Sequence, residues 1–69
     1  MAPKQQEILK LIQRQFQQGR EELTFPEIYQ ALGISKNNFS NYIAAVAHKL
    51  TEAGLQIRHG RPKVVVKLP

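Results

Sequence analysis

Leu23–Ile43, LTFPEIYQALGISKNNFSNYI, is the segment that decides the fold of this chain. Its Thr24 is followed three residues later by Glu27, which is the pattern of a capping box. In a capping box the Thr hydroxyl accepts a hydrogen bond from the backbone N–H of the Glu, and the Glu carboxylate accepts one from the backbone N–H of the Thr. The pattern predicts a helix over residues 25–32.

A second helix follows after a turn of only a few residues. Gly33 tolerates the positive φ that ends a helix, and Ser35 offers a side-chain oxygen that can cap the next helix. The pattern predicts a helix over residues 36–53. Two helices joined by so short a turn have the outline of a helix-turn-helix, whose second helix can enter the major groove of DNA.

The predicted helix 36–53 has one apolar and one polar face. At about 100° per residue its large apolar residues share a stripe that we expect to be buried: Phe39, Ile43, Val46 and Leu50. The opposite face carries Asn37, Asn41 and His48, with Ala44 and Ala45 beside them. Carboxamides one turn apart, next to small residues, favour contact with base edges in the major groove. An ordinary solvated polar face is the alternative.

The residues before this segment predict an earlier helix over residues 3–18. Pro3 suits the first turn of a helix, and Gly19 suits the position after its end. The apolar residues between them recur at helical spacing: Ile8, Leu9, Leu11, Ile12 and Phe16. We expect the residues around Leu23 to form an extended bridge that can add a strand to a sheet.

The C-terminal residues 55–68 have the pattern of a β-hairpin. Gly54 fits the position after a helix end, and Gly60-Arg61-Pro62 separates two segments that alternate in part between apolar and polar residues. We expect five residues to face inward: Leu55, Ile57, Val64, Val66 and Leu68. Three basic residues then lie at or near the tip: Arg58, Arg61 and Lys63. They can contact DNA phosphates, or instead protect a sheet edge from aggregation.

Length and composition exclude several classes of protein. Sixty-nine residues form one domain, 1–69, whose core is too small for a buried active-site cavity, so we do not expect an enzyme. Without cysteine the chain has no thiolate zinc site, and two histidines are too few for a metal site. The longest apolar run, Val64–Val66, is far shorter than a membrane span. We expect a cytoplasmic protein without a metal, a cofactor, a small-molecule substrate or a membrane partner.

The net charge of +5 lies entirely in the second half of the chain. Residues 1–35 contain four basic and four acidic residues, which cancel. Residues 36–69 contain six basic residues against the single acid Glu52. The predicted helix 36–53 and the hairpin therefore carry the whole positive field, which favours nucleic acid as a partner.

Three stretches resemble winged helix DNA-binding domains, most nearly the N-terminal domains of LexA-type and DeoR-type bacterial repressors. They are Gln5–Ile12, which resembles the first helix of those domains, Glu27–Gly33, which resembles the second, and Gly54–Gly60, which resembles the entry into the wing. The resemblance covers nearly the whole chain, and each motif is short and shared by many winged helix families. It implies an α+β fold of three helices and a two-stranded wing, with 36–53 as the recognition helix and the bridge near Leu23 as a short third strand.

These features together predict sequence-specific binding of double-stranded DNA by a transcription regulator, as a monomer or as a homodimer. We expect the recognition helix in the major groove and the basic wing on adjacent phosphates or in the minor groove. The expected DNA-binding residues are Lys36, Asn37, Asn38, Ser40, Asn41, Ala44, His48, Lys49, Arg58, Arg61 and Lys63. A winged helix that binds an acidic protein partner in a larger assembly is the main alternative. Structured RNA is a weaker one, because its deep major groove excludes a helix.

Overall fold

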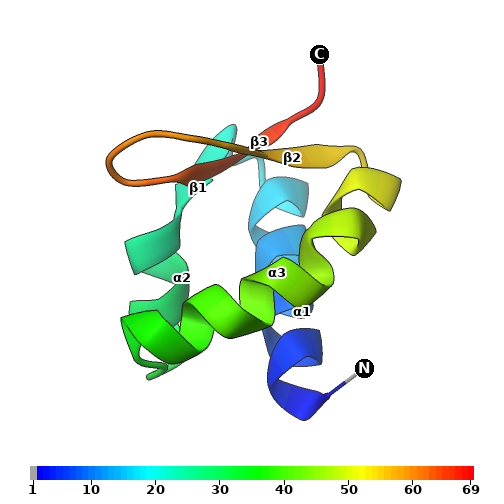
Figure 1. Ribbon diagram of the computed structural model, residues 1–69. Helices are drawn as coiled ribbons and strands as arrows, with labels where there is room; N and C mark the ends of the chain where they lie inside the picture. The colour runs from blue at the N-terminus through cyan, green and yellow to red at the C-terminus, as the bar shows by residue number, and fades with distance from the viewer. Residues whose placement is uncertain (1) are drawn as a thin grey trace.

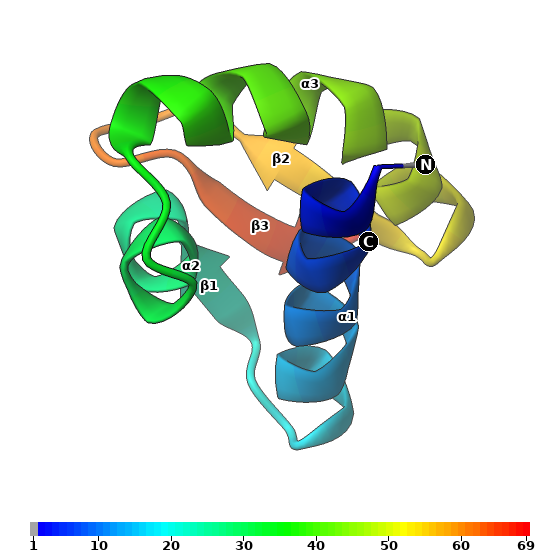
Figure 2. The same ribbon diagram turned by 90° about the horizontal axis from the view of Figure 1, so that it is seen from below.

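The computed structural model describes residues 2–69 as three helices and a three-stranded antiparallel sheet (Figure 1). The elements follow in the order α1 (Pro3–Gln17), β1 (Glu22–Thr24), α2 (Phe25–Ala31), α3 (Lys36–Glu52), β2 (Leu55–Arg58) and β3 (Val64–Lys67). The sheet lies across one side of the helices, and α3 crosses α1 at a steep angle (Figures 1 and 2). This α+β arrangement confirms the predicted class and the third strand around Leu23. None of the described helices is both long and apolar enough to span a membrane.

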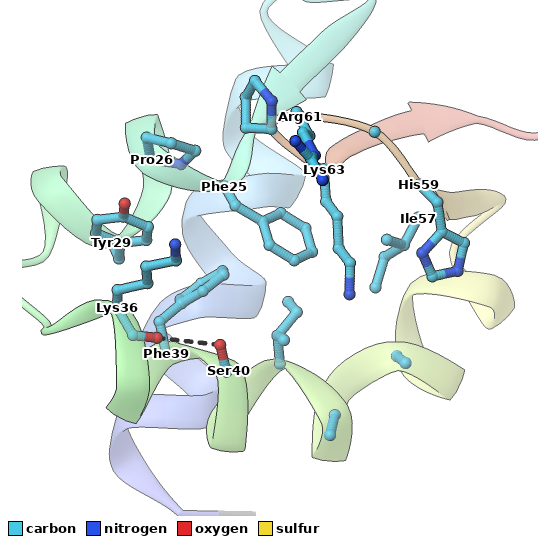
Figure 3. Close-up of a pocket in the computed structure, with 15 residues that line it drawn as sticks. Phe25, Pro26, Tyr29, Lys36, Phe39, Ser40, Ile57, His59, Arg61 and Lys63 are labelled. Atoms are coloured by element: carbon cyan, nitrogen blue, oxygen red, sulfur yellow. Dashed lines mark hydrogen bonds between the residues drawn. The ribbon is translucent and has the colours of Figure 1, made fainter.

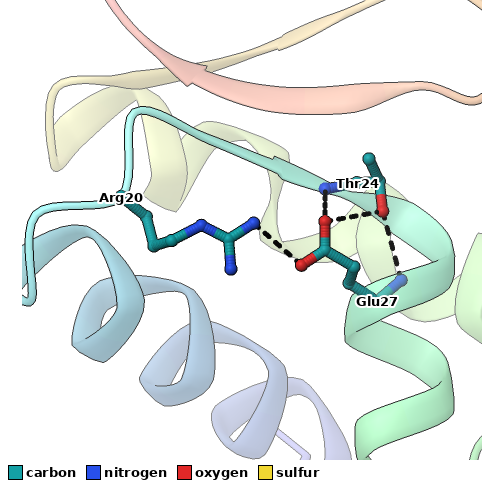
Figure 4. A network of polar contacts seen from close by, with 3 residues as sticks. All are labelled: Arg20, Thr24 and Glu27. Atoms are coloured by element: carbon teal, nitrogen blue, oxygen red, sulfur yellow. Dashed lines mark hydrogen bonds and ion pairs between the residues drawn. The ribbon is translucent and has the colours of Figure 1, made fainter.

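The start of α2 confirms the predicted capping box (Figure 4). The backbone N–H of Glu27 donates to Thr24 Oγ1 at 3.3 Å, and the backbone N–H of Thr24 donates to Glu27 Oε1 at 3.3 Å. The other carboxylate oxygen accepts a 2.8 Å hydrogen bond from Arg20. The Arg20 hydrogen bond lowers the pKa of Glu27, burial opposes this shift, and the hydrogen bonds from Thr24 add to the lowering. Glu27 thereby ties the loop before β1 to the first turn of α2.

The turn between α2 and α3 follows from three residues. Gly33 has a φ of 65°, a left-handed conformation that other residues adopt only with strain. The backbone N–H of Ile34 donates to the Tyr29 carbonyl at 2.9 Å, which closes the end of α2. Ser35 Oγ accepts a 3.2 Å hydrogen bond from the backbone N–H of Asn38 and so caps α3. These contacts fix the direction in which α3 leaves the turn.

One core holds the helices to the inner face of the sheet. The predicted stripe of α3 is buried, and it packs with residues of α1, α2 and all three strands. The cluster comprises Ile8, Ile12, Phe16, Leu23, Ile28, Phe39, Ile43, Val46, Leu50, Leu55 and Val65. Phe39 lies beneath α2, with its ring centroid 5.1 Å from that of Phe25 and 5.6 Å from that of Tyr29. The described residues include no buried polar or charged side chain.

The register of the sheet corrects the predicted hairpin by one residue. β3 is the central strand, and Val65 pairs with Leu23 of β1 and with Ile57 of β2. Because paired residues share a face of the sheet, Val65 faces the core, while Val64 and Val66 lie on the outer face, where neighbouring side chains still bury Val64. Leu68, also expected inward, follows the end of β3 and is 40% exposed. Three consecutive valines give no alternation from which a register can be predicted, whereas pairing on both sides of β3 fixes it.

Candidate nucleic-acid interface

The outward side of α3 is the first part of the candidate interface. All eight predicted DNA-binding residues on this helix are exposed: Lys36, Asn37, Asn38, Ser40, Asn41, Ala44, His48 and Lys49. At about 100° per residue, Asn37, Asn41 and His48 point away from the buried stripe. Their exposed side chains present amide and imidazole groups without an acidic neighbour on that face.

A groove runs along one edge of this face. It lies between α2, α3 and the loop that joins β2 to β3, and its volume is about 730 Å³. Five of the predicted residues line it: Lys36, Ser40, Ala44, Arg61 and Lys63. The structure therefore brings the start of α3 and the hairpin loop together at one site (Figure 3). Ser40 Oγ donates to the Lys36 carbonyl at 3.1 Å, which directs its hydroxyl hydrogen to the helix and leaves its lone pairs available.

The hairpin loop His59–Lys63 is held over the groove by the first residue of α2. The backbone N–H of Phe25 donates to the Lys63 carbonyl at 3.0 Å and so continues the pairing of β1 with β3. Lys63 precedes Val65 by two residues and shares its inner face, so its side chain extends toward α3 (Figure 3). The same one-residue register that buries Val65 thus places a cation in the groove.

Three predicted residues lie away from both the groove and the outward line of Asn37, Asn41 and His48. Arg58 is on the outer face of the sheet, where it forms a 3.3 Å ion pair with Glu22 across the central strand. Lys49 is on the flank of α3 that faces away from the hairpin loop, and it pairs with Glu52 at 3.6 Å. Asn38 is on the same flank. The structure does not bring these three side chains together with the five that line the groove.

In the described part of the chain, the basic residues of the groove have no acidic partner, unlike Lys4, Arg20, Lys49 and Arg58. The side chains of Lys36, His59, Arg61 and Lys63 form no hydrogen bond or ion pair within residues 2–69, and no acidic residue lines the groove. Four acids are instead paired elsewhere: Glu7 with Lys4, Glu22 with Arg58, Glu27 with Arg20 and Glu52 with Lys49. The structure therefore concentrates positive charge at the groove more than the sequence count implies.

The sequence interpretation missed His59 and the side of the groove formed by Phe25, Pro26 and Tyr29. His59 follows the predicted strand at Arg58, so its place in the hairpin loop was a usable signal. The α2 residues gave no such signal, because only the long-range contact of Phe25 with Lys63 sets α2 beside the loop.

Neither a metal-binding cluster among the described residues nor a comparison with known proteins gives further information on the function of this interface. The part of the chain that the structure describes contains no group of three or more potential ligands for a metal ion. Comparison with known proteins finds no matching family model, no similar curated protein and no similar solved structure. Inferences about function therefore depend on the residues of the interface.

Proposed function

We propose that this chain is a winged helix domain that binds double-stranded DNA sequence-specifically and acts in transcriptional regulation. α2 and α3 form its helix-turn-helix, α3 is the recognition helix, and β2 with β3 forms the wing. One observation carries the proposal: an exposed carboxamide face of α3 stands beside a groove whose cations have no acidic partner. Two copies binding two half-sites are compatible with this mode of recognition.

The groove cations supply the phosphate contacts in this proposal. Lys36 lies at the start of α3, and Arg61 and Lys63 lie on the wing, so phosphates on a strand that passes between helix and wing meet charge from both sides. Such contacts fix the position of a protein on the duplex without reading its sequence. Lys49 and Arg58 contribute less, because each is already compensated by a glutamate.

The outward face of α3 supplies the base contacts. Asn41 is exposed at the middle of that face, and a carboxamide can accept and donate to N6 and N7 of adenine at once. Asn37 lies one turn earlier and can read a neighbouring base. Ala44, exposed between this face and the groove, can contact a thymine methyl group.

Selection of bound sequences from random duplex DNA, followed by titration of Asn41→Ala, tests the proposal. We expect this substitution to cost roughly 1–3 kcal/mol on the selected site and little on random duplex. Gln17→Ala, which removes an exposed carboxamide from α1, is the matched control and leaves both affinities unchanged. The proposal fails if no sequence is enriched, or if Asn41→Ala lowers both affinities equally in a folded protein.

A further inference from the structure

The groove has apolar walls, and a DNA backbone bound at the groove would leave these walls uncovered. Phe25 and Tyr29 of α2 are half-buried, and so are Ala47 of α3 and Ile57 of β2, so each presents part of its surface to the groove. Pro62 of the wing is exposed at the opposite rim. A phosphate strand is polar and charged, so it satisfies the cations of the rim without covering these carbon atoms.

The basic rim and the apolar walls of the groove together indicate which ligand other than DNA could bind there. The rim carries Lys36 on one side and His59, Arg61 and Lys63 on the other, with no acid in the lining (Figure 3). The interior between these sides is formed by aromatic and aliphatic groups. An occupant that satisfies both needs an apolar side chain for the interior and negative charges beside it.

We propose that this groove binds an acidic peptide segment of a partner protein. An aromatic or branched aliphatic side chain of the segment lies between Phe25 and Ile57, and flanking carboxylates pair with Lys36, Arg61 and Lys63. The volume of about 730 Å³ accommodates one or two such side chains of a segment that crosses the groove. Burial of the anchor gives affinity, and the cations select against basic segments.

The peptide and DNA exclude each other at this site. Both use Lys36, Arg61 and Lys63, whereas only DNA uses the outward face around Asn41. A partner with such a segment therefore acts as a competitor that releases DNA. The peptide site itself does not depend on DNA binding, because its walls and its cations are present in the chain alone.

Selection from a displayed library of short random peptides against the full chain tests the composition of the occupant. We expect enriched peptides that combine Glu or Asp with Phe, Trp, Leu or Ile. Replacing the enriched apolar residue by Ser in a synthetic peptide is expected to weaken binding by tenfold or more, about the free energy of burying one large side chain. No enrichment, enrichment of basic peptides, or indifference to the Ser replacement overturns the proposal.

A pair of double variants tests the location. Lys36→Glu with Lys63→Glu is expected to weaken the peptide about tenfold, since two attractions become repulsions. Lys10→Glu with Arg14→Glu makes the same change in net charge on exposed α1 residues outside the groove, and we expect less than a twofold effect. Equal losses in the two variants overturn the site. Lys36→Gln with Lys63→Gln repeats the test if charge reversal lowers stability.

Asn41→Ala separates the two proposals. We expect it to remove sequence preference for DNA while leaving peptide affinity unchanged. Peptide binding without any DNA binding refutes the proposed function alone. A single-stranded oligonucleotide that binds in the groove, as mapped by amide chemical shifts of Phe25 and Ile57, while acidic peptides do not bind, refutes the peptide proposal alone.

Discussion

The two faces of the hairpin use their basic residues in opposite ways. Arg58 directly precedes the hairpin loop and Lys63 is its last residue. Arg58 lies on the outer face of the sheet and pairs with Glu22, while Lys63 lies on the inner face without an acidic partner. Strand register, which decides the face, therefore decides which cation is available to a ligand. A count of basic residues in the hairpin does not distinguish them.

Ion pairs elsewhere on the surface show the same difference between paired basic residues and the unpaired basic residues of the groove. Glu7, Glu27 and Glu52 also pair with basic residues, all of them outside the groove. These exposed pairs add little stability each, but they remove positive potential from the surface they occupy. The groove keeps its charge because none of these acids reaches it.

The difference between the two faces depends on the core beneath the groove. Truncating a side chain of that core should have the largest effect on stability. Phe39 is 1% exposed and supports both Phe25 and Tyr29, so we expect Phe39→Ala to lower the free energy of unfolding by about 3–5 kcal/mol. Asn37→Ala, on the exposed face of the same helix, should change it by less than roughly 0.5 kcal/mol. Urea titrations of both variants give the comparison. If Asn37→Ala unfolded the domain while Phe39→Ala behaved like the parent, α3 would have to be rotated about its axis, with its polar face toward the core.

The next largest effect should be on DNA affinity, where a basic residue of the groove should matter more than one on the outer face of the sheet. Arg61→Ala should weaken binding to every duplex by roughly 1–2 kcal/mol and reduce the slope of log affinity against log salt by about 0.9 per lost phosphate contact. Arg58→Ala, which removes a compensated cation from the outer face, should change the slope much less. Fluorescence anisotropy over a range of salt concentrations measures both. Equal slopes for the two variants would show that the groove cations have no special role.

For stability, in contrast to DNA binding, Arg58→Ala should have a larger effect than Arg61→Ala. Arg58→Ala breaks the ion pair with Glu22 and should cost about 0.2–1 kcal/mol, whereas Arg61→Ala should cost nothing measurable. A double-mutant cycle with Glu22→Gln isolates the pair. A coupling energy of zero would mean that Glu22 and Arg58 do not interact in solution.

The smallest effect is the pH dependence of the stability that the ion pair of Arg20 with Glu27 contributes. The pKa of Glu27 is lowered in the folded state, so its contribution is complete above the ordinary Glu pKa and is lost as pH falls through the lowered value. Glu27→Gln should therefore be less stable than the parent near neutral pH, by less than about 1 kcal/mol for so exposed a group, and the difference should vanish in acid. Thermal melts across this range test it. Glu21→Gln, whose carboxylate forms no ion pair in residues 2–69, should show no such pH-dependent difference.

Local patterns in the sequence predict most of the elements and the core. The capping residues Thr24 and Ser35 mark the starts of α2 and α3, and helical periodicity identifies the buried stripe of α3. Each of these signals depends on residues within one or two turns of each other. They fix which face of α3 is exposed, and with it the candidate base contacts.

The groove and the charge pairing could not be predicted in this way, because long-range contacts create them. Phe25 meets Lys63, and Glu22 meets Arg58, only after β1 has paired with β3. The run Val64–Val66 offers the same apolar character in either register, so the inward position of Lys63 was not visible. The predicted list of basic residues therefore combined side chains that the fold separates.

The central position of β3 also has a consequence for biosynthesis. Both other strands pair only with β3, and Val65 of β3 is fully buried among residues from the whole chain. The helices therefore emerge from the ribosome with one side of their core uncovered, and no part of the sheet can form before β3 is available. The long sequence separation between β1 and β3 makes their pairing entropically costly. Chains stalled before β3 should expose the apolar surface that chaperones and proteases recognise.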